Sequence, residues 1–307
     1  MPKAKTTTVS LVLGSGGARG LAHIGIIQWL EEQGYRIESL AGASMGALVG
    51  GIYAAGELNA YRSWVCALSR GDVLRFLDFA FSAGGLFKGD RIMETLREMV
   101  GEHLIEDLPI SYTAVAVDID RQREVWFSRG SLFDAIRASI AVPSVFTPHR
   151  MRGMTLVDGG LLNPVPIAPT FRDQTDLTVA VNLNAEPPRT GREPSAAAGA
   201  AAEGEPDGRY QDRIRQFLDS LGGGLRPPAR SDLSVFDLVS RAFETMQNAI
   251  AAVKLGAYAP DVVIQVPRDA CAAHEFHRAH EMIELGHRLA EEAMGPTRTL
   301  ARVQRGG

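Results

Sequence analysis

The hydrophobic positions in the first 60 residues switch between the two periods of regular secondary structure. A continuous β-branched and aliphatic run at 7–13 predicts a buried strand. Apolar residues three positions apart from Leu21 to Leu30 then predict a helix that ends near Gly34. A second strand is expected at 36–41 and a second helix at 47–55. This order of strand, helix, strand and helix is typical of a parallel sheet with helices on its faces.

The rest of the chain continues this pattern of alternating elements. Further helices are expected at 61–83, 91–100, 132–140, 235–255 and 280–293, and further strands at 112–118, 124–127, 155–157, 177–183 and 262–266. Pro143 stops the helix at 132–140, because a residue before proline avoids the helical conformation. We therefore expect a three-layer α/β/α domain with a mostly parallel central sheet.

The composition changes sharply at Glu186. Residues 187–208 are rich in Pro, Ala, Gly and Glu and offer little to bury, so we expect a single domain over 1–307 with a flexible insertion at about 186–231. Within the insertion, one apolar face predicts a helix at 210–221, with Arg209, Arg213 and Arg215 nearby. A peripheral membrane contact is compatible with this helix. The favoured interpretation is a helix docked on the core or on a homodimer partner.

Charge and cysteine content narrow the class of protein. The net charge of −4 and the pI near 6.0 give no indication of a nucleic-acid partner. Cys66 and Cys271 form no C-x-x-C motif and imply no disulfide framework, which fits a reduced, cytoplasmic setting. The first eight residues lack the apolar segment of a signal peptide, and no apolar run reaches the length of a membrane span.

A glycine-rich loop, Gly14-Ser-Gly-Gly-Ala-Arg-Gly20, joins the first predicted strand to the first predicted helix. Free backbone N–H groups at a helix N-terminus suit an anion. A dinucleotide pyrophosphate does not fit, because Arg19 stands where the third glycine of G-x-G-x-x-G should be. A Walker loop does not fit either, since no Gly-Lys-Ser/Thr follows. The remaining anion is the transient oxyanion of acyl transfer, which needs a nucleophile nearby.

A second motif, Gly42-Ala43-Ser44-Met45-Gly46, follows the second predicted strand. G-x-S-x-G between a strand and a helix makes a sharp turn that exposes a serine Oγ, and Gly42 and Gly46 allow the backbone to bend tightly. An ordinary glycine-rich turn with a surface serine has the same pattern. The two motifs support each other, because adjacent parallel strands place their C-terminal loops side by side.

With a third motif, Val157-Asp158-Gly159-Gly160, the sequence resembles the patatin-like phospholipase family, particularly its small bacterial cytoplasmic branch. The resemblance runs from about Val9 to about Asn184, with GSGGARGLAHIGII, GASMG and VDGG in the family's order. Ser15 departs from the pattern, since many relatives have glycine there. Serine keeps the backbone N–H, so we expect little loss.

The resemblance implies a catalytic dyad. Ser44 would be the nucleophile and Asp158 the base, with Gly159 and Gly160 letting the aspartate loop approach closely. The oxyanion hole would be formed by the N–H groups of Gly16, Gly17 and Ala18, with Arg19 and Gly20 as the supporting loop. Arg19 would orient the loop or meet a lipid phosphate, and the first role is favoured. No metal or cofactor is expected.

The seven histidines offer no Ser-Asp-His triad in the required order. We interpret His23, beside the glycine loop, as a packing residue. The turn-rich apolar segment at 82–89 is either a wall or cover for an acyl chain or a packed connection between helices.

These observations lead to the hypothesis of a serine acyl hydrolase that cleaves carboxylic esters of lipids, either phospholipids and lysophospholipids or small acyl esters, through an acyl-enzyme. An acyltransferase on the same dyad, a non-catalytic regulatory protein that keeps the fold, and a nucleotide-binding module are the alternatives.

Overall fold

A computed structural model describes residues 6–76, 89–143, 145–187 and 235–305. The described residues up to 187 and from 240 onward belong to one compact unit, which holds all three sequence motifs. The expected insertion at about 186–231 lies almost wholly outside the described residues, as do the helix expected at 210–221 and nearly all of the segment at 82–89.

The eight-stranded sheet has the order β5-β6-β3-β2-β1-β7-β8, with β4 paired to β3 beside this path. Five strands are parallel, and β4, β5 and β6 form antiparallel pairs at one side. The strands are β1 (Thr8–Leu13), β2 (Arg36–Ala43), β3 (Ser111–Asp118), β4 (Arg123–Phe127), β5 (His149–Met151), β6 (Met154–Asp158), β7 (Leu177–Ala185) and β8 (Val262–Pro267). The expectation of a mostly parallel sheet is confirmed.

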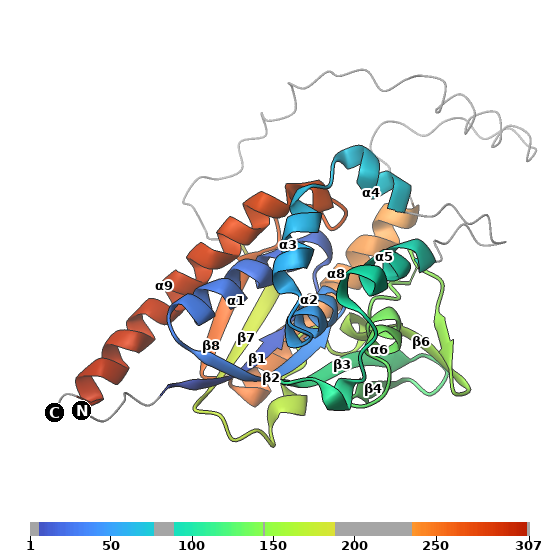
Figure 1. The fold of residues 1–307 in the computed structure, drawn as a ribbon. Coiled ribbons are helices and arrows are strands. Elements are labelled where there is room, and N and C mark those ends of the chain that lie inside the picture. The colour runs from blue at the N-terminus through green and yellow to red at the C-terminus, as the bar shows by residue number, and fades with distance from the viewer. Residues whose placement is uncertain (1–5, 77–88, 144, 188–234, 306–307) are drawn as a thin grey trace, which may run out of the picture. The chain divides into compact units, whose positions relative to one another are not determined.

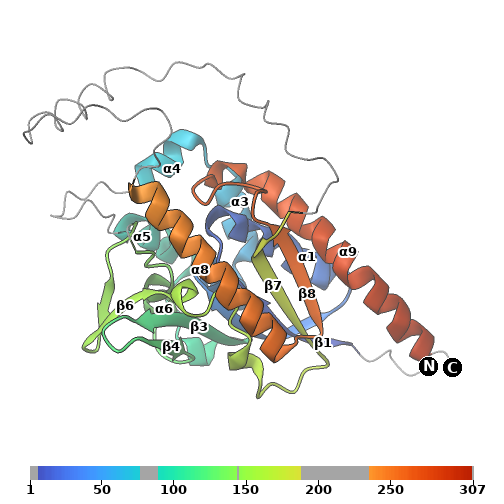
Figure 2. The same cartoon turned by 180° about the vertical axis from the view of Figure 1, so that it is seen from behind.

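Helices cover both faces of the sheet. The helices are α1 (Ala22–Glu32), α2 (Met45–Ala54), α3 (Leu58–Cys66), α4 (Arg70–Phe76), α5 (Asp90–Val100), α6 (Leu132–Ser139), α8 (Val235–Tyr258) and α9 (Ala279–Arg305). In Figure 1, α1, α2, α3 and α9 lie in front of the sheet. Figure 2, seen from behind, shows α8 crossing the opposite face. The three-layer α/β/α architecture follows.

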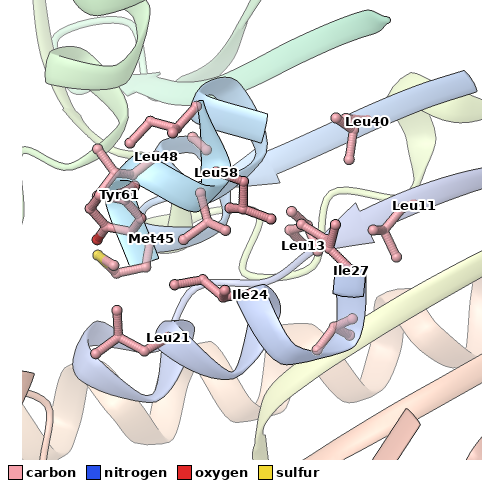
Figure 3. Close-up of a cluster of buried hydrophobic side chains, with 14 of the residues drawn as sticks. Leu11, Leu13, Leu21, Ile24, Ile27, Leu40, Met45, Leu48, Leu58 and Tyr61 are labelled. Carbon is pink, nitrogen blue, oxygen red and sulfur yellow. The ribbon is translucent and has the colours of Figure 1, made fainter. Parts of the chain in front are cut away.

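The alternation of side chains along β1 divides the core between these two faces. Val9, Leu11 and Leu13 belong to the larger buried cluster, to which α1, α2, α6 and α9 contribute. Figure 3 shows Leu11 and Leu13 among the apolar side chains of α1, α2 and α3. Val12 points to the other face and packs in a small cluster with Ala251 of α8. The layer under α8 therefore has much less apolar packing than the layer under α1 and α9.

One expected helix, at 61–83, is wrong as a single element over 61–76, and its last part, at 77–83, lies outside the described residues. The structure has two helices there, α3 and α4, and the second begins after Ser69. The Asp72 carboxylate accepts hydrogen bonds from the backbone N–H and the hydroxyl of Ser69, at 3.0 and 2.6 Å. The N–H of Asp72 donates back to Ser69 Oγ at 3.3 Å. This reciprocal cap starts a new helix, which an apolar periodicity alone does not reveal.

Other elements differ in extent. Strand β5 pairs antiparallel with β6 and was not expected from the sequence. Helix α9 starts one residue before the expected helix and continues to Arg305. The remaining strands and α-helices among the described residues overlap their expected ranges, with ends displaced by up to three residues.

Candidate active site

The three sequence motifs meet at the carboxyl ends of the central strands. β1 and β2 are parallel neighbours, with Leu13 in register with Gly42, so the glycine loop and the turn at Ser44 leave the sheet side by side. A Cβ on Gly46 would lie 2.0 Å from the Leu13 carbonyl oxygen, and one on Gly42 would lie 2.5 Å from the Ala47 nitrogen. Only glycine fits at either position, because both would force a side chain into the backbone.

Ser44 occupies the turn between β2 and α2 in a conformation that non-glycine residues rarely adopt. Its φ is +55° and its ψ is −124°. The residue is 6% exposed. Its N–H donates to Ser139 Oγ at 2.9 Å, and its carbonyl accepts the first helical bond of α2 from Leu48 at 3.1 Å. Strained positions of this kind persist where surrounding contacts over-determine them, and they cluster at functional sites.

Asp158 is the last residue of β6 and is buried, with 1% exposure. Its N–H donates to the Ala141 carbonyl at 3.0 Å, and its Oδ1 accepts from the Gly160 N–H at 2.7 Å. Oδ2 has no partner of normal hydrogen-bond geometry among the described residues. A Cβ on Gly159 would lie 2.0 Å from the Val115 carbonyl oxygen, so the loop after Asp158 runs directly against β3.

The electrostatics of Asp158 are dominated by its burial. Loss of water raises the pKa of the carboxyl to about 7, while the Ser44 hydroxyl and the Gly160 N–H act in the opposite direction. The Ser44 hydroxyl is therefore near enough to favour the carboxylate, although it does not form a bond of ideal geometry. Such a contact is common in enzymes without substrate, where catalytic hydrogen bonds are often long.

The N–H groups of the glycine loop divide into engaged and available donors. Those of Gly14, Ser15 and Ala18 donate to the carbonyls of Val181, Pro164 and Ala273, at 3.1, 2.8 and 2.8 Å. Those of Gly16 and Gly17 donate to no acceptor in the described parts of the chain. The expected set of oxyanion donors therefore needs a correction. The Ala18 N–H is already bonded to the Ala273 carbonyl, so the two available N–H donors are those of Gly16 and Gly17.

His23 lies beneath the start of this loop. Its Nε2 is 2.9 Å from the Gly14 carbonyl oxygen, and burial lowers the pKa of the ring to about 4. The ring is therefore neutral near pH 7, with its proton on Nε2, because the carbonyl can only accept. This contact agrees with the packing interpretation of His23.

Arg19 and Gly20 hold the loop from two other sides. The Arg19 guanidinium donates to the carbonyls of Arg268 and Cys271 at 3.0 and 3.2 Å, and to Asn184 Oδ1 at 2.9 Å. Glu244 of α8 lies 3.7 Å from the same group. A Cβ on Gly20 would lie 2.4 Å from the Met45 Cβ. The Arg19 contacts are those of a residue that orients the loop.

Sequence reasoning missed two polar residues at this site, Ser139 and Gln247. Ser139, at the end of α6, is fully buried and touches Ser44 as described. Gln247 of α8 donates from Nε2 to Ser15 Oγ at 3.3 Å, and a Cβ on Gly160 would lie 2.4 Å from the same nitrogen. For Ser139, the available signal was a lone polar residue among the apolar positions of its helix face. That signal does not tell which distant loop the residue meets. Gln247 shares its helix face with Lys254 and gave no such signal.

Comparison with known proteins shows which family the chain is similar to. A family model described as patatin-like phospholipase matches residues 11–171, which include all three motifs. Uncharacterized NTE family proteins of Mycobacterium bovis and Mycobacterium tuberculosis are each 40% identical over 93% of this chain and 91% of their own length. A protein named lysophospholipase nte1, from Emericella nidulans, is 32% identical over 57% of this chain and 12% of its own length.

Within the described parts of the chain, no helix combines the length and the apolar character that crossing a membrane requires. The family match spans more than half of the chain, and the mycobacterial relatives align over nearly all of it. On these grounds the chain belongs to the patatin-like phospholipase family.

Proposed function

We propose that this protein is a serine acyl hydrolase that cleaves carboxylic ester bonds of lipids with a Ser44–Asp158 dyad. The observation that carries the proposal is the buried Asp158 carboxyl, whose pKa is raised to about 7 and whose Oδ2 is left for the nearby Ser44 hydroxyl. A carboxylate deprived of water is a stronger base than one in solvent. The available N–H groups of Gly16 and Gly17 supply the second requirement, a place for negative charge.

Acylation uses these groups in one sequence of steps. Asp158 takes the proton of Ser44 Oγ while the oxygen attacks the ester carbonyl carbon. The carbonyl oxygen becomes an oxyanion that accepts hydrogen bonds from Gly16 and Gly17. When the tetrahedral intermediate collapses, the bond to the leaving oxygen breaks, and Asp158 returns the proton to that oxygen. An alcohol leaves, and the acyl group remains on Ser44.

Deacylation repeats the steps with water as the nucleophile. Asp158 removes a proton from the water as its oxygen attacks the acyl carbon, and it then protonates Ser44 Oγ as the carboxylic acid departs. If another alcohol replaced water, the same steps would transfer the acyl group. We propose water as the acceptor because this is the simplest reaction that the dyad supports.

The substrate class comes from the family and from one relative's name, which is lysophospholipase. We therefore propose phospholipids and lysophospholipids as substrates, together with small acyl esters, which need only the dyad and the oxyanion donors. Arg19 takes no part in headgroup binding in this proposal, because its guanidinium is already bonded to Asn184 and to the backbone of Arg268 and Cys271.

The test is covalent labelling with a fluorophosphonate, followed by mass mapping of the modified peptide. We expect a label on Ser44 in the wild type, no label in Ser44→Ala, and slow labelling in Asp158→Asn. Ser10→Ala is the matched control, since Ser10 is also fully buried but is bonded to Asp173 and Thr175 instead.

Two results would contradict the proposal. One is full esterase activity in Ser44→Ala, and the other is a label on a different serine. A wild type that stays unlabelled both with and without lysophospholipid micelles, while a control hydrolase reacts, would favour the non-catalytic alternative. Product analysis with added glycerol separates hydrolysis from acyl transfer, because transfer would form acylglycerol in place of free acid.

A further inference from the structure

One short segment, Ser139 to Ala141 at the end of α6, contacts both candidate catalytic residues. The Ser139 hydroxyl accepts the Ser44 N–H at 2.9 Å. Two residues later, the Ala141 carbonyl accepts the Asp158 N–H at 3.0 Å. The acceptors of these two bonds, a side-chain hydroxyl and a backbone carbonyl, belong to residues only two positions apart, so they fix the nucleophile and the base to a common frame.

The Ser139 hydroxyl is also tied to the sheet. It donates its proton to the Val115 carbonyl of β3 at 2.6 Å. Val115 is in register with Ala43, the residue before Ser44, and its carbonyl lies against Gly159, the residue after Asp158. The Val115 carbonyl of β3 therefore contacts both Ser139, which binds the Ser44 N–H, and Gly159, which follows Asp158.

The direction of these bonds leaves Ser139 little freedom. With its proton committed to Val115, the Ser139 oxygen can only accept from Ser44, and a hydroxyl in this position performs both tasks at once. The Ser44 N–H needs such an acceptor because the residue is buried and holds a φ of +55°. Without this acceptor, the buried N–H would lack a hydrogen bond, and the turn would lower its free energy by rotating the N–H toward another acceptor. That rotation would move Ser44 Oγ.

We infer that Ser139 is a positioning residue for catalysis: through its bonds to Ser44 and Val115 it holds the strained turn so that Ser44 Oγ faces Asp158. This inference rests on the proposed function of the dyad. It assigns Ser139 no contact with substrate. The competing role for Ser139 is that of an ordinary satisfied serine in the core, whose loss would lower stability and leave the chemistry unchanged.

The test compares Ser139→Ala, Ser139→Thr and Ser10→Ala in a purified esterase assay at a temperature where all are folded. Ser139→Ala is expected to lower kcat by roughly 100-fold, the effect of about 1 Å of misplacement at a reacting atom. KM should stay within about twofold, because Ser139 makes no contact with the substrate and its loss does not change how the substrate binds. Ser139→Thr keeps the hydroxyl and should recover most of kcat. Ser10→Ala should keep the wild-type kcat while lowering the unfolding temperature.

A second readout follows the carboxyl group. The Ser44 hydroxyl lowers the pKa of Asp158, so a turn that relaxes in Ser139→Ala should move the acidic limb of the kcat/KM profile to higher pH. Ser10→Ala should leave that limb in place. A change of stability alone does not shift it.

The outcomes separate the two hypotheses. Labelling of wild-type Ser44, together with a wild-type kcat and pH profile in folded Ser139→Ala, overturns the role of Ser139 and leaves the dyad intact. Absence of labelling at Ser44 in the wild type overturns the dyad itself. If Ser139→Ala does not fold, Ser139→Cys replaces it, because the cysteine side chain has nearly the same shape as serine but its sulfur is only a weak hydrogen-bond acceptor. Full kcat in that variant would then overturn the inference.

Discussion

The Asp158 carboxyl is under two opposing influences, burial that favours its neutral form and neighbouring donors that favour the carboxylate. Burial prevails, so the residue is poised near neutral pH instead of near 4. At the scale of one residue, the same shift affects both activity and stability, and the two effects have opposite signs.

The activity effect is a rise with pH. The base must be ionised to accept the Ser44 proton, so kcat/KM for a water-soluble ester should increase through about pH 7 and level off above it. An uncharged ester, such as a p-nitrophenyl acyl ester followed by titration of released acid, avoids ionisation of the substrate. A flat profile between about pH 5.5 and 8.5 would contradict the assignment of Asp158 as the base.

The stability effect is a fall with pH. Because the folded pKa of Asp158 lies above the unfolded value, its contribution is fully present below about pH 4 and is lost as pH rises through about 7. Asp158→Asn stays neutral and should therefore unfold at a higher temperature than the wild type at about pH 8. The difference should shrink as the pH is lowered, and an Asp158→Asn variant less stable than the wild type under the alkaline condition would overturn the prediction.

His23 should show the opposite dependence, because its folded pKa of about 4 lies below the ordinary histidine value of 6.5. The stability that it contributes is fully present above about pH 6.5 and is lost as pH falls toward 4. His23→Gln can donate to Gly14 without titrating, so its unfolding temperature should fall less than that of the wild type between about pH 7 and pH 5. An equal fall in unfolding temperature in both proteins would show that His23 is not the group responsible for the loss of stability at low pH.

At the scale of elements, α8 differs from the other helices in how it meets the sheet. Its apolar cluster is small, and its inward side carries polar groups: Gln247 contacts Ser15, and Lys254 Nζ lies 2.7 Å from the Glu124 carboxylate. The solvent side exposes Met246 and Val253, at 52% and 70%. The position of α8 thus depends on polar contacts more than the positions of α1 and α9 do.

Lys254→Met should therefore lower the free energy of unfolding by about 1–2 kcal/mol, because it leaves the half-buried Glu124 without its cation. Urea denaturation at neutral pH measures the change. The double variant with Glu124→Gln should recover part of the loss, which gives the coupling between the two side chains. Additive losses would mean that the ion pair does not hold α8.

The contrast between local patterns and contacts of distant residues explains how far the sequence predicts the structure. The first two strand–helix units are local patterns, and their elements lie where the periodicity places them. The break between α3 and α4 depends on one cap at Ser69, which interrupts a helix that the apolar pattern alone would continue. Ser139, Gln247 and the partner of Ala18 depend on residues about 95 to 255 positions away in the chain. No periodicity records such pairings, so that part of the site could not be predicted.

At the scale of the whole molecule, Arg19 joins segments 249 positions apart. Its guanidinium satisfies two carbonyls and the Asn184 side chain, a fork that a lysine ammonium does not match. Arg19→Lys should lower the unfolding temperature and reduce the rate of Ser44 labelling, since the loop that carries Gly16 and Gly17 loses its anchor. Wild-type values for both measurements would exclude this role.

The bond from the Ala18 N–H to the Ala273 carbonyl also sets an order of events in the cell. A ribosome makes the glycine loop first, but the carbonyls that fix it, at Arg268, Cys271 and Ala273, are synthesised about 250 residues later. Nascent chains that still lack these residues should carry Ser44 and Asp158 without a fixed oxyanion site. Under the proposed function, the oxyanion site would form only after the segment at 268–273 has been translated, so a shorter nascent chain would be inactive.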